Sequence, residues 1–480
     1  MTEKKSKKDD GKSPLEEKLL MKRPFSWEGM EAKKEKAVFE FCDGYKTFLN
    51  AAKTERLAAK EAVKQAEAHG FKPIGEANGL KAGDKVYAVN KHKNVILAVI
   101  GKGPISDGIN IVASHMDAPR LDLKQNPLYE DKDTQMAILR THYYGGIKKY
   151  QWVANPLALV GTVVLHDGKT VDISIGLGDD EPVFMAPDLL PHLAHKEQAE
   201  RKSQETIRGE ELQIVIGNMP INNKKVKEKI KVRVLEFLNK KYGIIEEDFL
   251  SAEIEAVPVG KARDVGLDRS MIGAYGQDDR ICSYTSMAAI FDAAKTAPER
   301  TAVALFVDKE EIGSDSNTGI KSKFLYNFVT ELLERSEEGC GCETMLVMSR
   351  CKALSADVNA GVEPNFKQVH EMSNASKIGF GVVMTKFTGS GGKYTANDAN
   401  AEFVGEIRVL FNKHKVAWQT GELGKVDEGG GGTVAKFLAE YAMDVIDCGP
   451  ALLSMHSTFE VSSKADVYAA YEAYKAFFLN

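Results

Sequence analysis

Few cysteines, no dominant charge and no long apolar run limit what this chain of 480 residues can be. Six cysteines do not make the disulfide framework of a small secreted protein. With 64 Lys+Arg and 69 Asp+Glu, the net charge of −5 excludes a nucleic-acid binder driven by bulk charge. The most apolar stretch, 152–165, is interrupted by Asn155, Pro156 and Gly161 and is shorter than a membrane span of about 18–20 residues. We therefore expect neither nucleic acid nor membrane as a partner.

The composition is that of a soluble globular protein, with 43% hydrophobic and 28% charged residues. Residues 1–13 carry mixed charge and lack the apolar core of a secretory signal, which predicts a cytoplasmic protein with a disordered tail. A basic docking tag is the alternative for this tail. Cys340 and Cys342 are either a metal or redox pair or two loop thiols in a reducing compartment.

Apolar runs followed by polar clusters recur along the chain and predict buried strands. The clearest are 109–113 and 302–307, and the same pattern is expected less cleanly at 344–348 and 449–455. Helical patterns lie between them, at 283–295, 324–334, 434–442 and 464–478. This alternation predicts an α/β fold, with a mixed and mainly parallel sheet flanked by helices.

The region 124–255 has a different pattern. The apolar run 157–165, the turn Asp167-Gly168 and the segment VDISIGL indicate antiparallel strands. A basic amphipathic helix follows, whose lysine-rich face is interpreted as solvated surface and whose apolar face carries Val226, Ile230, Val234, Phe237 and Leu238. We predict an inserted β-rich domain at 124–255 that divides a catalytic domain into 14–123 and 256–480.

Polar residues capable of chemistry stand where the predicted strands end. His115 could be a metal ligand oriented by Asp117, or a core histidine beside a helix-capping aspartate. Asp278, just before a predicted helix, could bridge two metal ions with its two oxygens or could cap that helix. Both interpretations stay open at each position.

Glu310 and Glu311 are adjacent carboxylates after a buried strand, an arrangement that is costly unless a cation or proton relieves it. One could bind metal and the other act as a general base, with a solvated loop as the alternative. Asp357 and His456 follow further apolar runs, and each alone is read as structural. Together these residues supply the mixed nitrogen and oxygen ligands that zinc accepts, but only a folded sheet could bring them together.

Taken in order, the motifs S-H-M-D-A-P-R, Q-D-D, D-K-E-E-I-G-S, L-S-A-D-V-N-A-G-V-E-P-N-F and M-H-S resemble those of the aspartyl aminopeptidase family of dinuclear zinc peptidases. The resemblance runs from about residue 35 to the C-terminus. It implies a zinc-exopeptidase-like α/β domain interrupted by a β-rich dimerisation domain. It also implies a homo-oligomer, a tetrahedral dodecamer built from dimers, that removes N-terminal residues from peptide substrates.

The same resemblance implies roles for individual residues. His115 would bind one zinc ion, Asp278 would bridge two, and Glu311, Asp357 and His456 would complete the set of ligands. Glu310 would be the general base and Asp117 the carboxylate that supports the site. The expected cofactor is two Zn²⁺ per subunit, with Mn or Co able to occupy the same ligands. Rival hypotheses are another co-catalytic metallohydrolase, such as a carboxypeptidase or N-deacylase, and a non-catalytic scaffold of this fold.

Four further residues have weaker support. His192 is similar to a segment that the family inserts into a neighbouring subunit's active site, where it would stabilise the tetrahedral intermediate, or it is a surface histidine. Lys393 is either a substrate contact or a solvated lysine. Gly431 and Gly432 either let the backbone approach a peptide or belong to a flexible loop. Departures from the family motifs leave the preference for an acidic or neutral N-terminal residue open.

Overall fold

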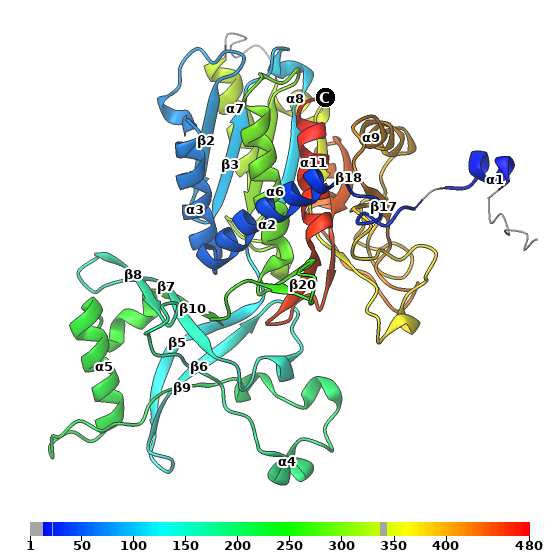
Figure 1. The fold of residues 1–480 in the computed structure, drawn as a ribbon. Coiled ribbons are helices and arrows are strands. Elements are labelled where there is room, and N and C mark those ends of the chain that lie inside the picture. The colour runs from blue at the N-terminus through cyan, green and yellow to red at the C-terminus, as the bar shows by residue number, and fades with distance from the viewer. Residues whose placement is uncertain (1–12, 22, 337–342) are drawn as a thin grey trace, which may run out of the picture.

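The computed structural model describes residues 13–21, 23–336 and 343–480. In these ranges no helix combines the length and the apolar character needed to cross a membrane. The polypeptide forms an upper lobe around one large sheet and a lower lobe around a second sheet (Figure 1).

The large sheet has nine strands in the order β1-β2-β3-β13-β4-β14-β18-β16-β17. Their bounds are β1 Lys72–Pro73, β2 Lys85–Asn90, β3 Asn94–Val99, β4 Asn110–His115, β13 Ala302–Val307, β14 Lys352–Ser355, β16 Val382–Thr385, β17 Trp418–Thr420 and β18 Asp444–Gly449. The central strands β13, β4, β14 and β18 are all parallel, whereas β3 pairs antiparallel with β13 and β16 with β18. This confirms the predicted mixed and mainly parallel sheet.

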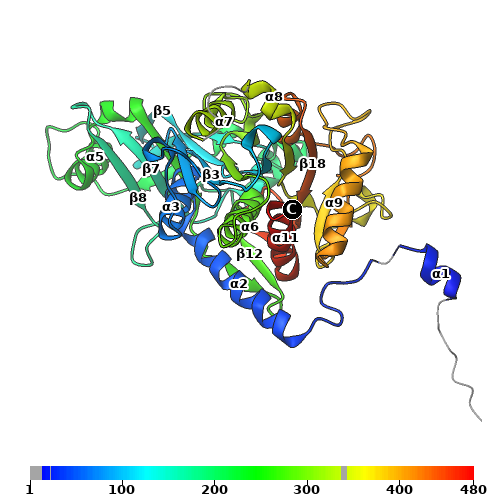
Figure 2. The ribbon, with the colours of Figure 1, turned by 90° about the horizontal axis from the view of Figure 1, so that it is seen from above.

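Helices cover both faces of this sheet, as the view from above shows (Figure 2). One face carries α2 (Ala32–Ala51), α3 (Glu55–Ala68), α6 (Gln277–Ala293), α9 (Ala401–Lys413) and α11 (Lys464–Phe478). The opposite face carries α7 (Phe324–Arg335), α8 (Thr344–Ser349) and α10 (Ala435–Ala439). Strand β3 shows why: Val95 and Leu97 pack on the first face and Ile96 on the second, so its side chains are buried on both sides.

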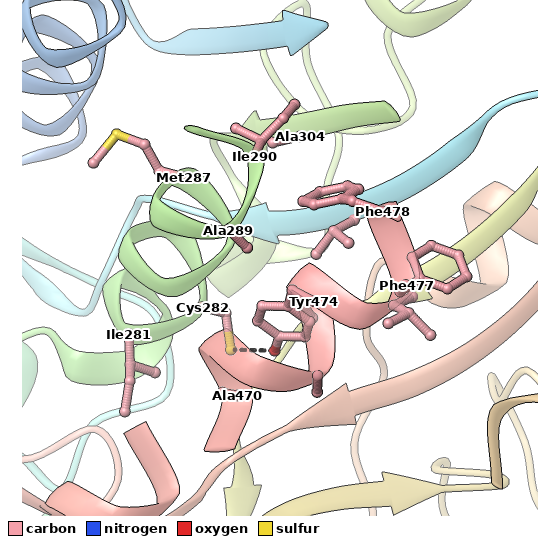
Figure 3. Close-up of a cluster of buried hydrophobic side chains, with 14 of the residues drawn as sticks. Ile281, Cys282, Met287, Ala289, Ile290, Ala304, Ala470, Tyr474, Phe477 and Phe478 are labelled. Carbon is pink, nitrogen blue, oxygen red and sulfur yellow. Dashed lines mark hydrogen bonds between the residues drawn. The ribbon is translucent and has the colours of Figure 1, made fainter. Parts of the chain in front are cut away.

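The first face is packed most closely between α6 and α11 (Figure 3). Phe477 and Phe478 are buried at the end of α11, and Tyr474 donates a hydrogen bond to the Cys448 carbonyl at 2.7 Å. The Tyr474 hydroxyl also lies 3.4 Å from Cys282 Sγ on α6. This packing holds the start of α6, which carries Asp278, against the sheet.

The lower lobe is built on a six-stranded antiparallel sheet in the order β8-β7-β10-β5-β6-β9. Its strands are β5 Arg120–Asp131, β6 Met136–Tyr144, β7 Leu157–Val164, β8 Thr170–Ile175, β9 Ile214–Gly217 and β10 Ala252–Pro258, with helices α4 (Pro191–Glu197) and α5 (Lys229–Tyr242) at its sides. The predicted boundaries of the inserted domain fall inside β5 and β10. Its role in dimerisation stays a prediction.

A small third sheet, of five strands, joins the two lobes near the ends of the central strands. Its order is β11-β12-β20-β19-β15, formed by β11 Arg263–Val265, β12 Met271–Ala274, β15 Asn359–Ala360, β19 Ala451–Leu453 and β20 Glu460–Ser463. Strand β12 leads directly into α6, and β19 leads to His456. This sheet therefore fixes two of the predicted site residues.

Some expected elements are wrong. The segment 344–348 was expected to be a strand but lies in α8, because a short apolar run fits a half-buried helix equally well, and the strand before Asp357 is β14. The run 449–455 spans the end of β18 and the short β19 in another sheet. In α5, Phe237 is exposed although it was assigned to the apolar face. Cys340, Cys342 and all of the predicted tail except Ser13, which caps α1 (Pro14–Leu19), lie outside the described residues.

Candidate metal centre

The predicted ligands meet at the carboxyl ends of the central strands. His115 is the last residue of β4, Glu310 and Glu311 follow β13, and Asp357 follows β14. Asp278 lies in the first turn of α6, and His456 follows β19. Crevices at the carboxyl ends of parallel strands are the usual ligand sites of α/β sheets.

Asp278 lies between the two histidines. Its Oδ1 is 3.2 Å from Nε2 of His115, and its Oδ2 is 3.2 Å from Nε2 of His456. Glu311 Oε2 lies 3.4 Å from the same nitrogen of His456, and Asp357 Oδ1 lies 3.8 Å from that of His115. Asp278 is thus the shared member of two groups of donors, one around each histidine.

Both imidazoles are oriented in the way that metal-binding histidines require. Nδ1 of His115 lies 3.0 Å from the backbone carbonyl oxygen of Asp117 and 3.3 Å from the side-chain Oδ1 of Asp117. Nδ1 of His456 faces the Gly146 carbonyl at 2.7 Å. Since each Nδ1 can donate to an oxygen, the lone pair of Nε2 is directed into the site.

Three carboxylates of the site are difficult to keep charged without a cation. Burial raises the pKa of Glu310 to about 7 and the pKa of Glu311 and Asp357 well above the ordinary range. Glu311 also has a buried Oε1 without a hydrogen-bond partner. For Asp278, burial is outweighed by the two histidines, which hold its pKa below the ordinary value. A bound divalent cation would offset the cost of burying these negative charges.

Two additional carboxylates hold the backbone of the ligand loops. Asp117 is fully buried and accepts the N–H groups of Glu310 and Glu311, each at 3.2 Å. Glu460 accepts the N–H of His456 at 2.9 Å and that of Asp278 at 3.3 Å. Asp117 was predicted as a supporting residue. Glu460 was missed, because nothing in its strand sequence distinguishes it from a surface glutamate.

The site opens into a cavity of about 440 Å³. Gly431 and Gly432 line its wall together with Thr395, Leu423 and Lys436. Lys393 does not line this cavity: its Nζ lies 3.0 Å from Asp398 and over the Phe387 ring. The two glycines therefore line the cavity and Lys393 does not, and a substrate contact by any of the three stays a prediction.

His192 lies on α4, at the exposed edge of the lower lobe and away from the metal centre of its own chain (Figure 1). Its action in trans stays a prediction.

The residues fit a divalent metal. Among the described residues, two sets offer donor atoms within 4.8 Å of one another, His115 with Asp278 and Glu311, and His115 with Glu310 and Asp357. A mixed nitrogen and oxygen donor set of this kind suits zinc, with Mn or Co as chemically acceptable substitutes.

Known proteins share both the sequence and the fold. The family model described as "Aminopeptidase I zinc metalloprotease (M18)" matches residues 48–478. A curated relative from Clostridium acetobutylicum, named M18 family aminopeptidase 1, is 48% identical over 466 residues, which cover 96% of this chain and 99% of the relative.

Solved structures agree. The crystal structure of an M18 family aminopeptidase from Thermotoga maritima is 44% identical with a TM-score of 0.90, over 96% of this chain and 99% of that one. A yeast aminopeptidase solved as a dodecamer shares the fold, with a TM-score of 0.74 and 20% identity over 93% of this chain and 97% of that one. As its motifs predict, the protein belongs to the M18 family of zinc aminopeptidases.

Proposed function

We propose that this protein removes N-terminal amino acids from peptides at a centre of two zinc ions held by His115, Asp278, Glu311, Asp357 and His456. The observation that carries the proposal is the position of Asp278, whose two oxygens each lie 3.2 Å from a different histidine Nε2. When bound, zinc would polarise the scissile carbonyl, lower the pKa of the attacking water and hold the free α-amine.

Glu310 is proposed as the general base. Both glutamates line the cavity where a peptide would bind, but the Glu310 side chain is 15% exposed against 3% for Glu311. A carboxylate that lies beside the proposed ligands and faces the cavity is placed to take a proton from water and to return it to the leaving amine. Glu311, which lies nearer His456, is left as a ligand.

Asp117 fixes the positions of His115, Glu310 and Glu311 relative to one another. It holds His115 on one side and the backbone of Glu310 and Glu311 on the other. Although burial favours the neutral acid, the hydrogen bond from His115 holds the pKa of Asp117 below its ordinary value. An ionised Asp117 accepts all of these donors, which a neutral acid could not do equally well.

A pair of blocked and free substrates tests the proposed function against its rivals. The zinc-loaded protein is expected to cleave a free dipeptide and to leave its N-acetylated form intact. The acetyl group removes the lone pair through which the α-amine would bind zinc. Liquid chromatography of both reactions would measure this. Cleavage of the acetylated peptide at a comparable rate would instead indicate an N-deacylase or carboxypeptidase.

We further propose that the chains assemble into a homo-oligomer, a dodecamer built from dimers, in which His192 reaches a neighbouring metal centre. Support comes from the exposed place of His192 on α4 and from the fold shared with the yeast dodecamer. A solution mass of twelve chains is the expected result, and a monomer with full activity would contradict the assembly.

A further inference from the structure

Residues 144–146, at the end of strand β6, extend from the lower lobe onto the metal centre. We call them the Tyr144–Gly146 segment. Gly145 has φ +77°, and a Cβ there would stand 3.4 Å from Glu311 Oε2 and 3.3 Å from Pro119. Glycine therefore allows the backbone to turn and to approach a proposed ligand closely.

The Tyr144 side chain contacts Asp117 directly. Its hydroxyl donates to Asp117 Oδ2 at 2.7 Å, and both side chains are buried. Asp117 in turn contacts His115 and accepts the N–H groups of Glu310 and Glu311. The tyrosine hydroxyl thus completes the set of donors that fixes one carboxylate at the centre of the site.

A buried group of charges fixes the tyrosine ring in turn. The Arg120 guanidinium lies 3.8 Å from the centroid of the Tyr144 ring. Arg120 is held by Asp122 at 2.8 Å and by Glu55 and Glu255, each at 3.4 Å. Because these residues come from α3, β5 and β10, the ring is clamped where the two lobes meet.

The other end of the segment supports the second histidine. The Gly146 carbonyl accepts from His456 Nδ1 at 2.7 Å, which directs Nε2 of His456 toward Asp278. Tyr144 therefore contacts His115 indirectly, through Asp117, and Gly146 contacts His456 directly. Both histidines of the proposed site depend on one short segment.

We propose that Tyr144 is a positioning residue of the metal centre, acting through Asp117, and that the Tyr144–Gly146 segment couples the six-stranded sheet to metal affinity. This inference rests on the proposed two-metal function. It assigns to the lower lobe a part in building each subunit's own active site, in addition to any part in assembly.

The test is Tyr144→Phe, which removes the hydroxyl and keeps the ring that Arg120 contacts. We expect zinc affinity, titrated against a competing chelator, to fall by about 10- to 100-fold, as for other partners of metal ligands. We also expect kcat to fall while KM is unchanged. Tyr143→Phe is the matched control, because Tyr143 is exposed on the neighbouring position of the same strand.

Two further variants separate positioning from a general loss of stability. Asp117→Asn should weaken zinc binding, and adding Tyr144→Phe to it should weaken binding no further, because the hydroxyl acts through Asp117. Gly145→Ala, which strains the backbone of the segment without removing a side-chain donor, should also weaken zinc binding.

The outcomes distinguish this inference from the proposed function. A Tyr144→Phe protein with wild-type zinc affinity and kcat, even one with a lower melting temperature, would overturn the inference alone. Fully additive effects of Tyr144→Phe and Asp117→Asn would also overturn it. A wild-type protein that binds no zinc would overturn the proposed function and this inference with it.

Discussion

Replacing Glu310 with glutamine is expected to lower kcat by about 10²- to 10⁴-fold, the range that general-base catalysis contributes. Glutamine has nearly the same shape but cannot take a proton from water. Because Glu310 is not assigned to the ligands, the variant should keep the wild-type zinc content. Steady-state kinetics combined with elemental analysis would measure both quantities.

The matched control for this change is Glu334→Gln, an exposed glutamate on α7. It should have wild-type kcat and zinc content. A Glu310→Gln protein as active as an active wild type would exclude Glu310 as the base. If neither protein showed activity, the result would favour the scaffold hypothesis. Loss of zinc together with activity would instead place Glu310 among the ligands, as in the second of the two donor sets.

Replacing Asp278 with asparagine is expected to reduce zinc binding and to lower kcat/KM by more than about 100-fold. A ligand shared by two metal ions needs a lone pair on each of two oxygens. Asparagine has only one such oxygen and would direct its amide NH₂ toward one of the two proposed metal positions. The effect should exceed the typical loss of about 10- to 100-fold for a residue that only supports a ligand. Zinc content after dialysis and kcat/KM would be measured on the same samples.

Asp133→Asn, at an exposed position in the turn between β5 and β6, is the control for the loss of one carboxylate. It should leave both measurements unchanged. If Asp278→Asn retained wild-type zinc content and activity, Asp278 would be a helix-capping residue, the alternative that the sequence left open.

Much of the fold follows from the sequence because the signals are local. Strand β13 is a continuous apolar run, the apolar run 109–113 supplies most of β4, and the helix α11 coincides with its predicted range 464–478. The segment 344–348 could not be assigned in this way. Five apolar-rich residues fit a strand or a helical turn, and only packing of Val347 and Met348 against the sheet decides for α8.

Several proposed ligands and the proposed base could be selected because polar or charged residues after buried strands are costly and therefore conspicuous. His115, Glu310 and Asp357 are of this kind, and the structure places them within one cluster. The residues that support them lack such a signal. Tyr144 and Glu460 become significant only when β6 and β20 are brought beside the site.

The substrate contact that the resemblance implies for Lys393 stays a prediction. Its ammonium group pairs with Asp398. A side chain held in this way is directed by its nearest opposite charge, which the motif does not specify. The cavity wall instead includes Lys436, from α10.

Anomalous diffraction at the zinc absorption edge, from crystals of the wild-type protein, tests the central claim most directly. We expect two zinc peaks per chain, one beside Nε2 of His115 and one beside Nε2 of His456, with Asp278 between them. A single peak, or peaks that Asp278 does not contact, would contradict it.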